Sequence, residues 1–111
     1  MDYYDMEQYM AKQLLARWRT PTKTKKDNKY VRVWIKGRGA VGRSRLVIEL
    51  LTRRFLRKDE YVRHKNGKKW DDKPCNLVLD CGHLHHDFAG YAPKFREWVY
   101  QVARGAGKGG T

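Results

Sequence analysis

The sequence predicts a small α+β domain in which short strands and a central helix lie between two amphipathic helices. Apolar residues recur at helical spacing near both ends of the chain and once in its middle. Short apolar runs lie between these segments and are typical of strands. The chain has 111 residues, which is enough for one small domain and too few for two.

Residues 1–19 are expected to form an N-terminal amphipathic helix, because Met6, Met10, Leu14 and Trp18 recur every fourth residue and make one apolar stripe. This helix either packs on the core or docks on a partner. Residues 20–29 contain no large apolar residue and several lysines, so they are expected to be a flexible basic linker.

Residues 30–92 are expected to form the main domain. Its first strand is predicted at residues 30–35, where polar and apolar side chains alternate. The glycine-rich basic segment 36–43 is interpreted as a hairpin turn or a contact with the DNA backbone. Ser44 is a candidate N-cap for a helix over residues 45–56, with an apolar face toward the strands and arginines on the other face.

A second hairpin is predicted around the pair Asn66-Gly67, which favours a turn because both residues tolerate positive φ. Apolar runs at residues 61–62 and 77–79 would be its strands. A histidine-rich helix start is expected at residues 83–86. Beyond it, residues 93–104 have the spacing of a C-terminal helix, and residues 105–111 are a flexible Gly/Lys tail.

Composition indicates a polyanionic partner. Lys and Arg together number 25 and Asp and Glu number 12, so the net charge is +13 and nucleic acid is the expected partner. No apolar stretch approaches the roughly 20 residues of a membrane span, and the acidic start is not a signal peptide. Cys75 and Cys81 fit reduced thiols, so a cytoplasmic location is expected.

The segment from Arg45 to Leu79 reads RLVIELLTRRFLRKDEYVRHKNGKKWDDKPCNLVL. It resembles, without a gap, the HNH endonuclease family of phages and mobile elements, whose pattern is roughly RLVxExxLGRxLxxxExVHHKNGxxxDNxPxNLxL. The match covers about a third of the chain. The resemblance implies a ββα-metal (HNH) finger with an upstream strand and helix, and a metal-dependent DNA endonuclease or nickase that hydrolyses phosphodiester bonds.

The resemblance also implies roles for individual residues. His64 would be the general base, Asn76 would pin the loop by side-chain hydrogen bonds, and His85 would bind the metal, most readily Mg²⁺, with Mn²⁺, Ni²⁺ or Zn²⁺ as alternatives. Arg63 stands where the family has a metal-binding His or Asp. Because a guanidinium has no lone pair for a cation, Arg63 would grip the phosphate instead. The loop also has Asp72 where the family normally has Asn.

Two groups of residues complete the expected site. His83, His86 and Asp87 are interpreted as accessory ligands, phosphate contacts or plain surface. Contacts with the nucleic-acid backbone are expected from Arg38, Arg43, Arg45, Arg53, Arg54, Lys65, Lys68 and Lys69.

A second function remains open. The substitution at Arg63 also fits a catalytically inactive protein that uses the same fold to bind nucleic acid or to inhibit host machinery. Such a protein would meet a protein partner through the N-terminal or C-terminal helix.

Overall fold

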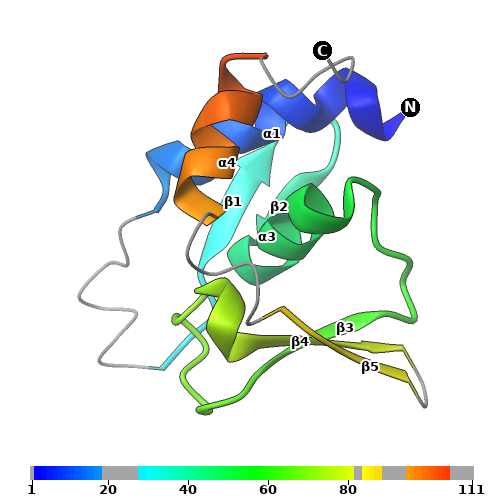
Figure 1. Cartoon of the computed structure of the whole chain (residues 1–111), viewed down its shortest axis with the longest axis vertical. Helices are drawn as coiled ribbons and strands as arrows, with labels where there is room; N and C mark the ends of the chain where they lie inside the picture. Colours follow the sequence, from blue (N-terminus) through cyan, green and yellow to red (C-terminus); the bar gives the residue numbers. More distant parts are fainter. Residues whose placement is uncertain (1, 19–27, 82–83, 89–94, 106–111) are drawn as a thin grey trace.

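The computed structural model describes residues 2–18, 28–81, 84–88 and 95–105, with only the backbone described at positions 81, 84 and 85. These residues form a small α+β fold (Figure 1). Helices α1 (Tyr3–Ala16) and α4 (Phe95–Ala103) pack against each other at one end, and a three-stranded sheet lies at the other. A two-stranded hairpin and helix α3 (Arg43–Thr52) lie between them.

Both terminal helices are confirmed, with slightly different ends. The apolar stripe of α1 is buried, since Met10 and Leu14 have no exposed surface, and it belongs to the same core as Val99 and Val102 of α4. Helix α1 therefore packs on the core. Most of the predicted linker (residues 20–27) and most of the tail (residues 106–111) lie outside the described part of the chain, as do residue 19 and residues 93–94 of the predicted terminal helices.

Strands β1 (Arg32–Ile35) and β2 (Gly39–Gly42) form an antiparallel hairpin, in which Val33 pairs with Val41. The glycine-rich segment makes its turn, and Gly37 and Gly39 have positive φ values of 88° and 84°. Glycine adopts this region without the clash that a Cβ would cause. Of the two interpretations of this segment, the hairpin is thus the one observed.

Helix α3 begins earlier and ends earlier than predicted. Its N-cap is Gly42, not Ser44, and no side chain caps its first turn. The helix stops at Thr52 because Arg53 adopts a left-handed conformation with φ 56°. Its apolar face is buried as expected, through Leu46, Val47, Ile48 and Leu50.

The second hairpin is confirmed, but the prediction of a helix after it is wrong. Strand β3 (Tyr61–His64) pairs with β4 (Leu77–Cys81), and a 3₁₀ turn (Pro74–Asn76) leads into β4. Residues 84–87 then form a strand, β5 (Leu84–Asp87), along the other edge of β4. Pairing with β4 satisfies the backbone groups of β5 that face β4, and the core residue Phe88 (3% exposed) follows at its end.

Buried carboxylates tie the segments together, since Glu7, Glu49 and Glu60 each have no more than 2% of their surface exposed. Each one receives two hydrogen bonds from a single guanidinium. The pairs are Arg53 with Glu7, Arg38 with Glu49, and Arg54 with Glu60. Planar guanidinium and carboxylate groups match in this geometry, which satisfies buried charges that would otherwise destabilise the fold.

Glu60 gives a pH-dependent test of this scheme. Hydrogen bonds from Arg54, and a further one from the Arg57 backbone N–H, lower the pKa of Glu60 from 4.5 to about 2. A carboxylate with a lowered folded-state pKa stabilises the fold above pH 4.5, and this stabilisation is lost as the pH falls toward 2. We expect the difference in unfolding free energy between wild type and Glu60→Gln, measured by urea titration, to shrink across that window.

Asp59→Asn is the matched control, because the neighbouring Asp59 side chain is 71% exposed and forms an ion pair with the exposed Arg57. Its effect should be small at every pH. A Glu60→Gln difference that stays constant from pH 6 to pH 2 would contradict the assigned ion pair.

Candidate nucleic-acid site around His64

His64 is the last residue of β3, and its side chain lies on the buried face of that strand. The ring nitrogen Nε2 is 2.6 Å from Oδ1 of Asp72, and both side chains are nearly inaccessible to solvent. An ionised carboxylate only accepts hydrogen bonds, so Nε2 is the ring nitrogen that donates to Asp72, and Nδ1 is the one that carries the lone pair in the neutral form of the ring. The ring is thereby oriented as it is in carboxylate–histidine pairs.

Arg43 completes this network. Its Nε donates to the other oxygen of Asp72 at 2.7 Å, and its terminal nitrogens donate to the carbonyl oxygens of Arg17, Trp18 and Trp70. Arg43 is only 2% exposed. The expectation that it contacts a nucleic-acid backbone is therefore corrected, because its guanidinium lies inside the fold and joins α1, α3 and the loop.

Asn76 makes the hydrogen bonds expected of it. Its Oδ1 accepts from the backbone N–H of Asn66 at 3.0 Å, and its Nδ2 donates to Asn66 Oδ1 at 3.0 Å and to the Asp71 carbonyl at 2.8 Å. The backbone N–H of Lys65 also donates to the Asn76 carbonyl. The loop after His64 is thus held at both ends by one amide side chain.

A surface pocket of about 370 Å³ opens beside His64. Arg63, Lys69 and Asp80 line it together with Tyr30 and His64. The Tyr30 ring lies 5.7 Å from the His64 ring, and Lys69 Nζ lies 5.1 Å from the centre of the Tyr30 ring. The pocket therefore combines an oriented imidazole with two cationic side chains.

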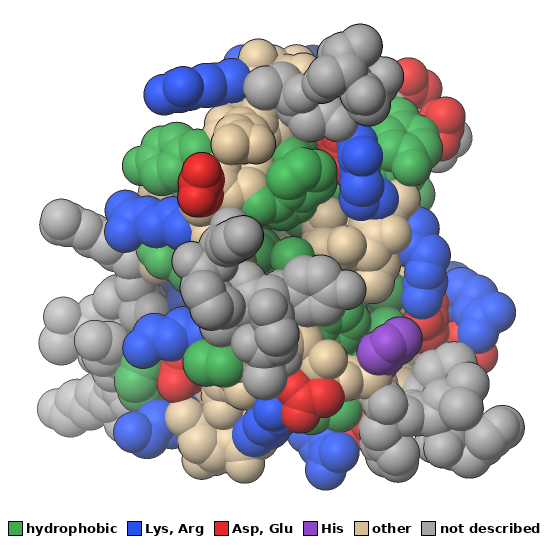
Figure 2. Space-filling view, in the orientation of Figure 1, with side chains coloured by type: hydrophobic (Ala, Val, Ile, Leu, Met, Phe, Trp, Pro, Cys, Tyr) green, Lys and Arg blue, Asp and Glu red, His purple; other side chains and the backbone are tan. Residues whose placement is uncertain are grey.

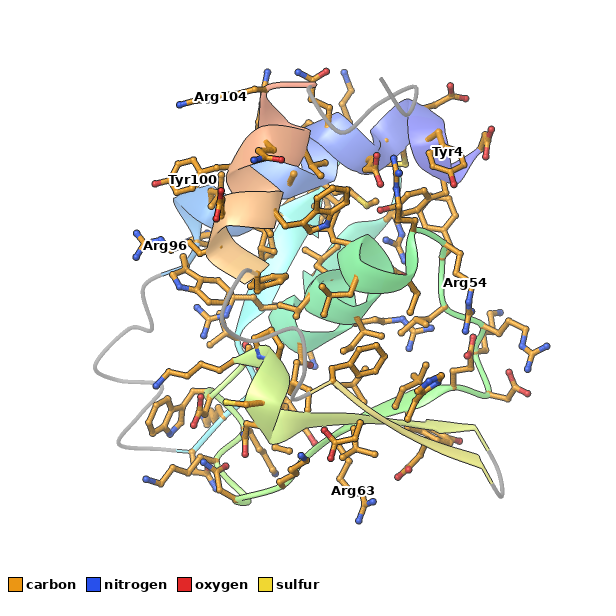
Figure 3. The ribbon with its side chains drawn as sticks, in the orientation of Figure 1. Tyr4, Arg54, Arg63, Arg96, Tyr100 and Arg104 are labelled. Carbon is orange, nitrogen blue, oxygen red and sulfur yellow. The ribbon has the colours of Figure 1, made fainter. Side chains whose placement is uncertain are left out.

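Arg63 belongs to the opposite face of β3. It is exposed and extends away from the helices, below the three-stranded sheet (Figure 3). Its Nε forms an ion pair of 3.0 Å with Oδ2 of Asp80, with 61% of the arginine side chain exposed. Exposed pairs contribute little stability, so a phosphate oxygen can replace Asp80 at small cost.

The predicted metal ligand His85 lies on β5, where the register pairs it with Asp80. Strand β4 separates β5 from β3, and His64 pairs with Leu77 whereas His85 pairs with Asp80, three residues further along β4. Two strand spacings sideways and three residues along the strand place the backbones of His64 and His85 about 14 Å apart. The side chain of His85 and the whole of His83 lie outside the described residues. Among the residues that are described, no three His, Cys, Asp or Glu side chains form a group able to hold a metal ion.

The accessory residues on β5 have other neighbours. His86 is exposed, and its ring lies 5.6 Å from that of Phe88. Asp87 forms an ion pair with Lys65. Neither contact points to a shared ligand with His64.

Most of the arginines expected at the nucleic-acid backbone have partners inside the protein. Arg38, Arg53 and Arg54 pair with glutamates, and Arg45 donates to the carbonyl oxygens of Glu60 and Arg57. Figure 2 shows Lys and Arg side chains spread over the visible face, several of them beside acidic ones. Lys68 and Lys69 instead lie over aromatic rings, those of Trp70 and Tyr30 respectively.

The site also contains Asp72, Tyr30 and Asp80, to which no sequence pattern gave a role. The sequence did distinguish Asp72, because this residue stands where the HNH pattern normally has Asn, eight residues after His64. Nothing in the sequence pointed to Tyr30 or Asp80, since each reaches the pocket only through the tertiary packing.

Comparison with protein families, with curated proteins and with solved structures gave no match to this chain. None of the helices in the described ranges has the length and apolar character that crossing a membrane requires.

The buried network predicts a strong contrast between two arginines. Arg43→Ala leaves the Asp72 carboxylate buried without its cation, and we expect it to lower the unfolding free energy by about 3–5 kcal/mol. Arg63→Ala removes an exposed pair and should cost less than about 1 kcal/mol. Equal effects of the two substitutions in urea denaturation would contradict the structural role given to Arg43.

Proposed function

We propose that this protein is an HNH-type nuclease that hydrolyses phosphodiester bonds in DNA, with His64 as the general base. The observation that supports this proposal is the contact between His64 and Asp72 at the wall of a cationic pocket. A histidine held by a carboxylate through one ring nitrogen presents the other nitrogen as a proton acceptor.

The chemistry that these residues provide is general-base hydrolysis. Nδ1 of His64 takes a proton from water as the water oxygen bonds to phosphorus, and the bond from phosphorus to the leaving sugar oxygen breaks. The leaving oxygen takes a proton from solvent. Arg63 exchanges Asp80 for a non-bridging phosphate oxygen, and Lys69 adds positive charge beside it.

The HNH resemblance implies a divalent cation, but the described side chains do not make a ligand set for one. No step is therefore assigned to a metal ion. The proposal depends on the contacts of His64 and on the positive charge of the pocket.

A plasmid-nicking assay tests the role of His64. We expect wild type to convert supercoiled DNA to the nicked form in Mg²⁺ or Mn²⁺, and His64→Ala to lose about 100-fold or more of the rate, as removal of a general base does. The measurement is the initial rate of nicking, with circular dichroism of each variant to verify folding.

Lys58→Ala is the control, because Lys58 is exposed and takes no part in the pocket. It should nick at the wild-type rate. Equal rates for wild type and a folded His64→Ala, in both metals, would overturn the nuclease proposal.

A second candidate function is nucleic-acid binding without cleavage. Strand β5, in place of the expected helix, favours it, because His85 is then carried on a strand separated from His64 by β4. A binder should hold DNA equally well with Mn²⁺ and with EDTA and give no heat on calorimetric titration with Mn²⁺. Heat of Mn²⁺ binding together with nicking would exclude it.

A further inference from the structure

One face of the first hairpin carries an unusual set of exposed side chains. From Tyr30 to Lys36 exposure alternates along the chain, with Val31, Val33 and Ile35 buried and the residues between them exposed. The exposed residues are Tyr30, Arg32, Trp34 and Lys36, so aromatic rings alternate with cations.

The neighbouring strand leaves these side chains uncovered. The register pairs Trp34 with Ala40 and Arg32 with Gly42, and both partners are small. Trp34 is 68% exposed and Tyr30 is 52% exposed. Burying aromatic surface is a main source of folding free energy, so rings this exposed contribute little to the stability of the chain itself.

This row of exposed side chains, the β1 stripe (Tyr30, Arg32, Trp34 and Lys36), adjoins the site at His64. A second pocket, of about 290 Å³, is lined by Lys29, Tyr30, Arg32 and Lys69, and it shares Tyr30 and Lys69 with the pocket at His64. Tyr61, which is 66% exposed, also lines the His64 pocket. Exposed rings are therefore found along the hairpin and in the lining of the pocket at His64.

We propose that this surface binds a single-stranded segment of nucleic acid, with bases stacked on Trp34, Tyr30 and Tyr61 and phosphates beside the cations between them. The rings of Tyr30 and Trp34 are set four residues apart on an extended chain, a backbone distance of about 13 Å, with Arg32 between them. Sequence-tolerant binding of single strands uses this combination of stacking platforms and a positive groove.

Charge favours nucleic acid over a protein as the occupant. The two pockets together are lined by four cations, Lys29, Arg32, Arg63 and Lys69, and by one carboxylate, Asp80. Lysine is depleted at protein interfaces, whereas a phosphate chain requires cations at intervals. Single strands are favoured over duplex because the faces of paired bases are already covered by their neighbours.

The inference depends on the nucleic-acid partner of the proposed function but not on cleavage. It adds that the substrate has an unpaired segment, which lies along β1 and reaches the pocket at His64 past Tyr30.

Fluorescence anisotropy with a labelled single-stranded oligonucleotide of about 12 nucleotides, in EDTA, tests the proposal without any cleavage. We expect Trp34→Ala to weaken binding about fivefold or more, as the loss of one stacked base does, and Trp34→Phe to retain most of the affinity. Both variants should bind the matching duplex as wild type does. Tyr100→Ala is the control, because Tyr100 is a 46% exposed ring on α4 and should leave binding unchanged.

The proposal is overturned if Trp34→Ala binds the single strand as wild type does, or if it weakens the binding of duplex and single strand alike. It is also overturned if Trp34→Ala changes only self-association, measured by sedimentation. A failure of the nuclease proposal is distinct, since it appears as equal nicking rates of wild type and His64→Ala and leaves binding in EDTA intact.

Discussion

The fold depends on one buried network, in which Asp72 accepts hydrogen bonds from both Arg43 and His64. Removing charges from water is costly, and the cost is offset here because the two carboxylate oxygens each meet a donor within 2.7 Å. Through Arg43 the same network reaches the carbonyl oxygens of Arg17, Trp18 and Trp70. The end of α1, the start of α3, the end of β3 and the loop after it therefore have one mutual arrangement.

Pairing with buried carboxylates also limits how much of the net charge acts on a partner. A value of +13 suggests a surface covered with free cations, yet Arg38, Arg53 and Arg54 are held by buried glutamates. These guanidiniums position α1, the first hairpin and the segment before β3, and they contribute less to an external field than their number implies. The cations of the pocket and of the β1 stripe, which face solvent beside aromatic rings, are better placed to meet a phosphate chain.

Strand β3 divides the candidate site between its two faces. His64 lies on the buried face, where Asp72 fixes its orientation, and Arg63 lies on the exposed face, where its pair with Asp80 is open to exchange. A base must be oriented before the reaction, whereas a phosphate contact forms only when substrate arrives. For the proposed nuclease, the alternation of side chains along a strand would supply both conditions from neighbouring residues.

The sequence by itself determined the terminal helices and the two hairpins, because helical spacing, alternation and turn-forming pairs are local properties of the chain. The loop held by Asn76 was implied by the resemblance to the HNH pattern, and its hydrogen bonds agree with that expectation. The sequence did not determine the start of α3 at Arg43, strand β5 in place of a helix, or the partner of His64. Each of these depends on segments remote in the chain: Arg43 meets Asp72 across 29 positions, and β5 exists because β4 offers a free edge. Contacts of this kind are decided only when the tertiary structure brings the partners together, since local preferences are weaker than buried charge pairing and backbone hydrogen bonding.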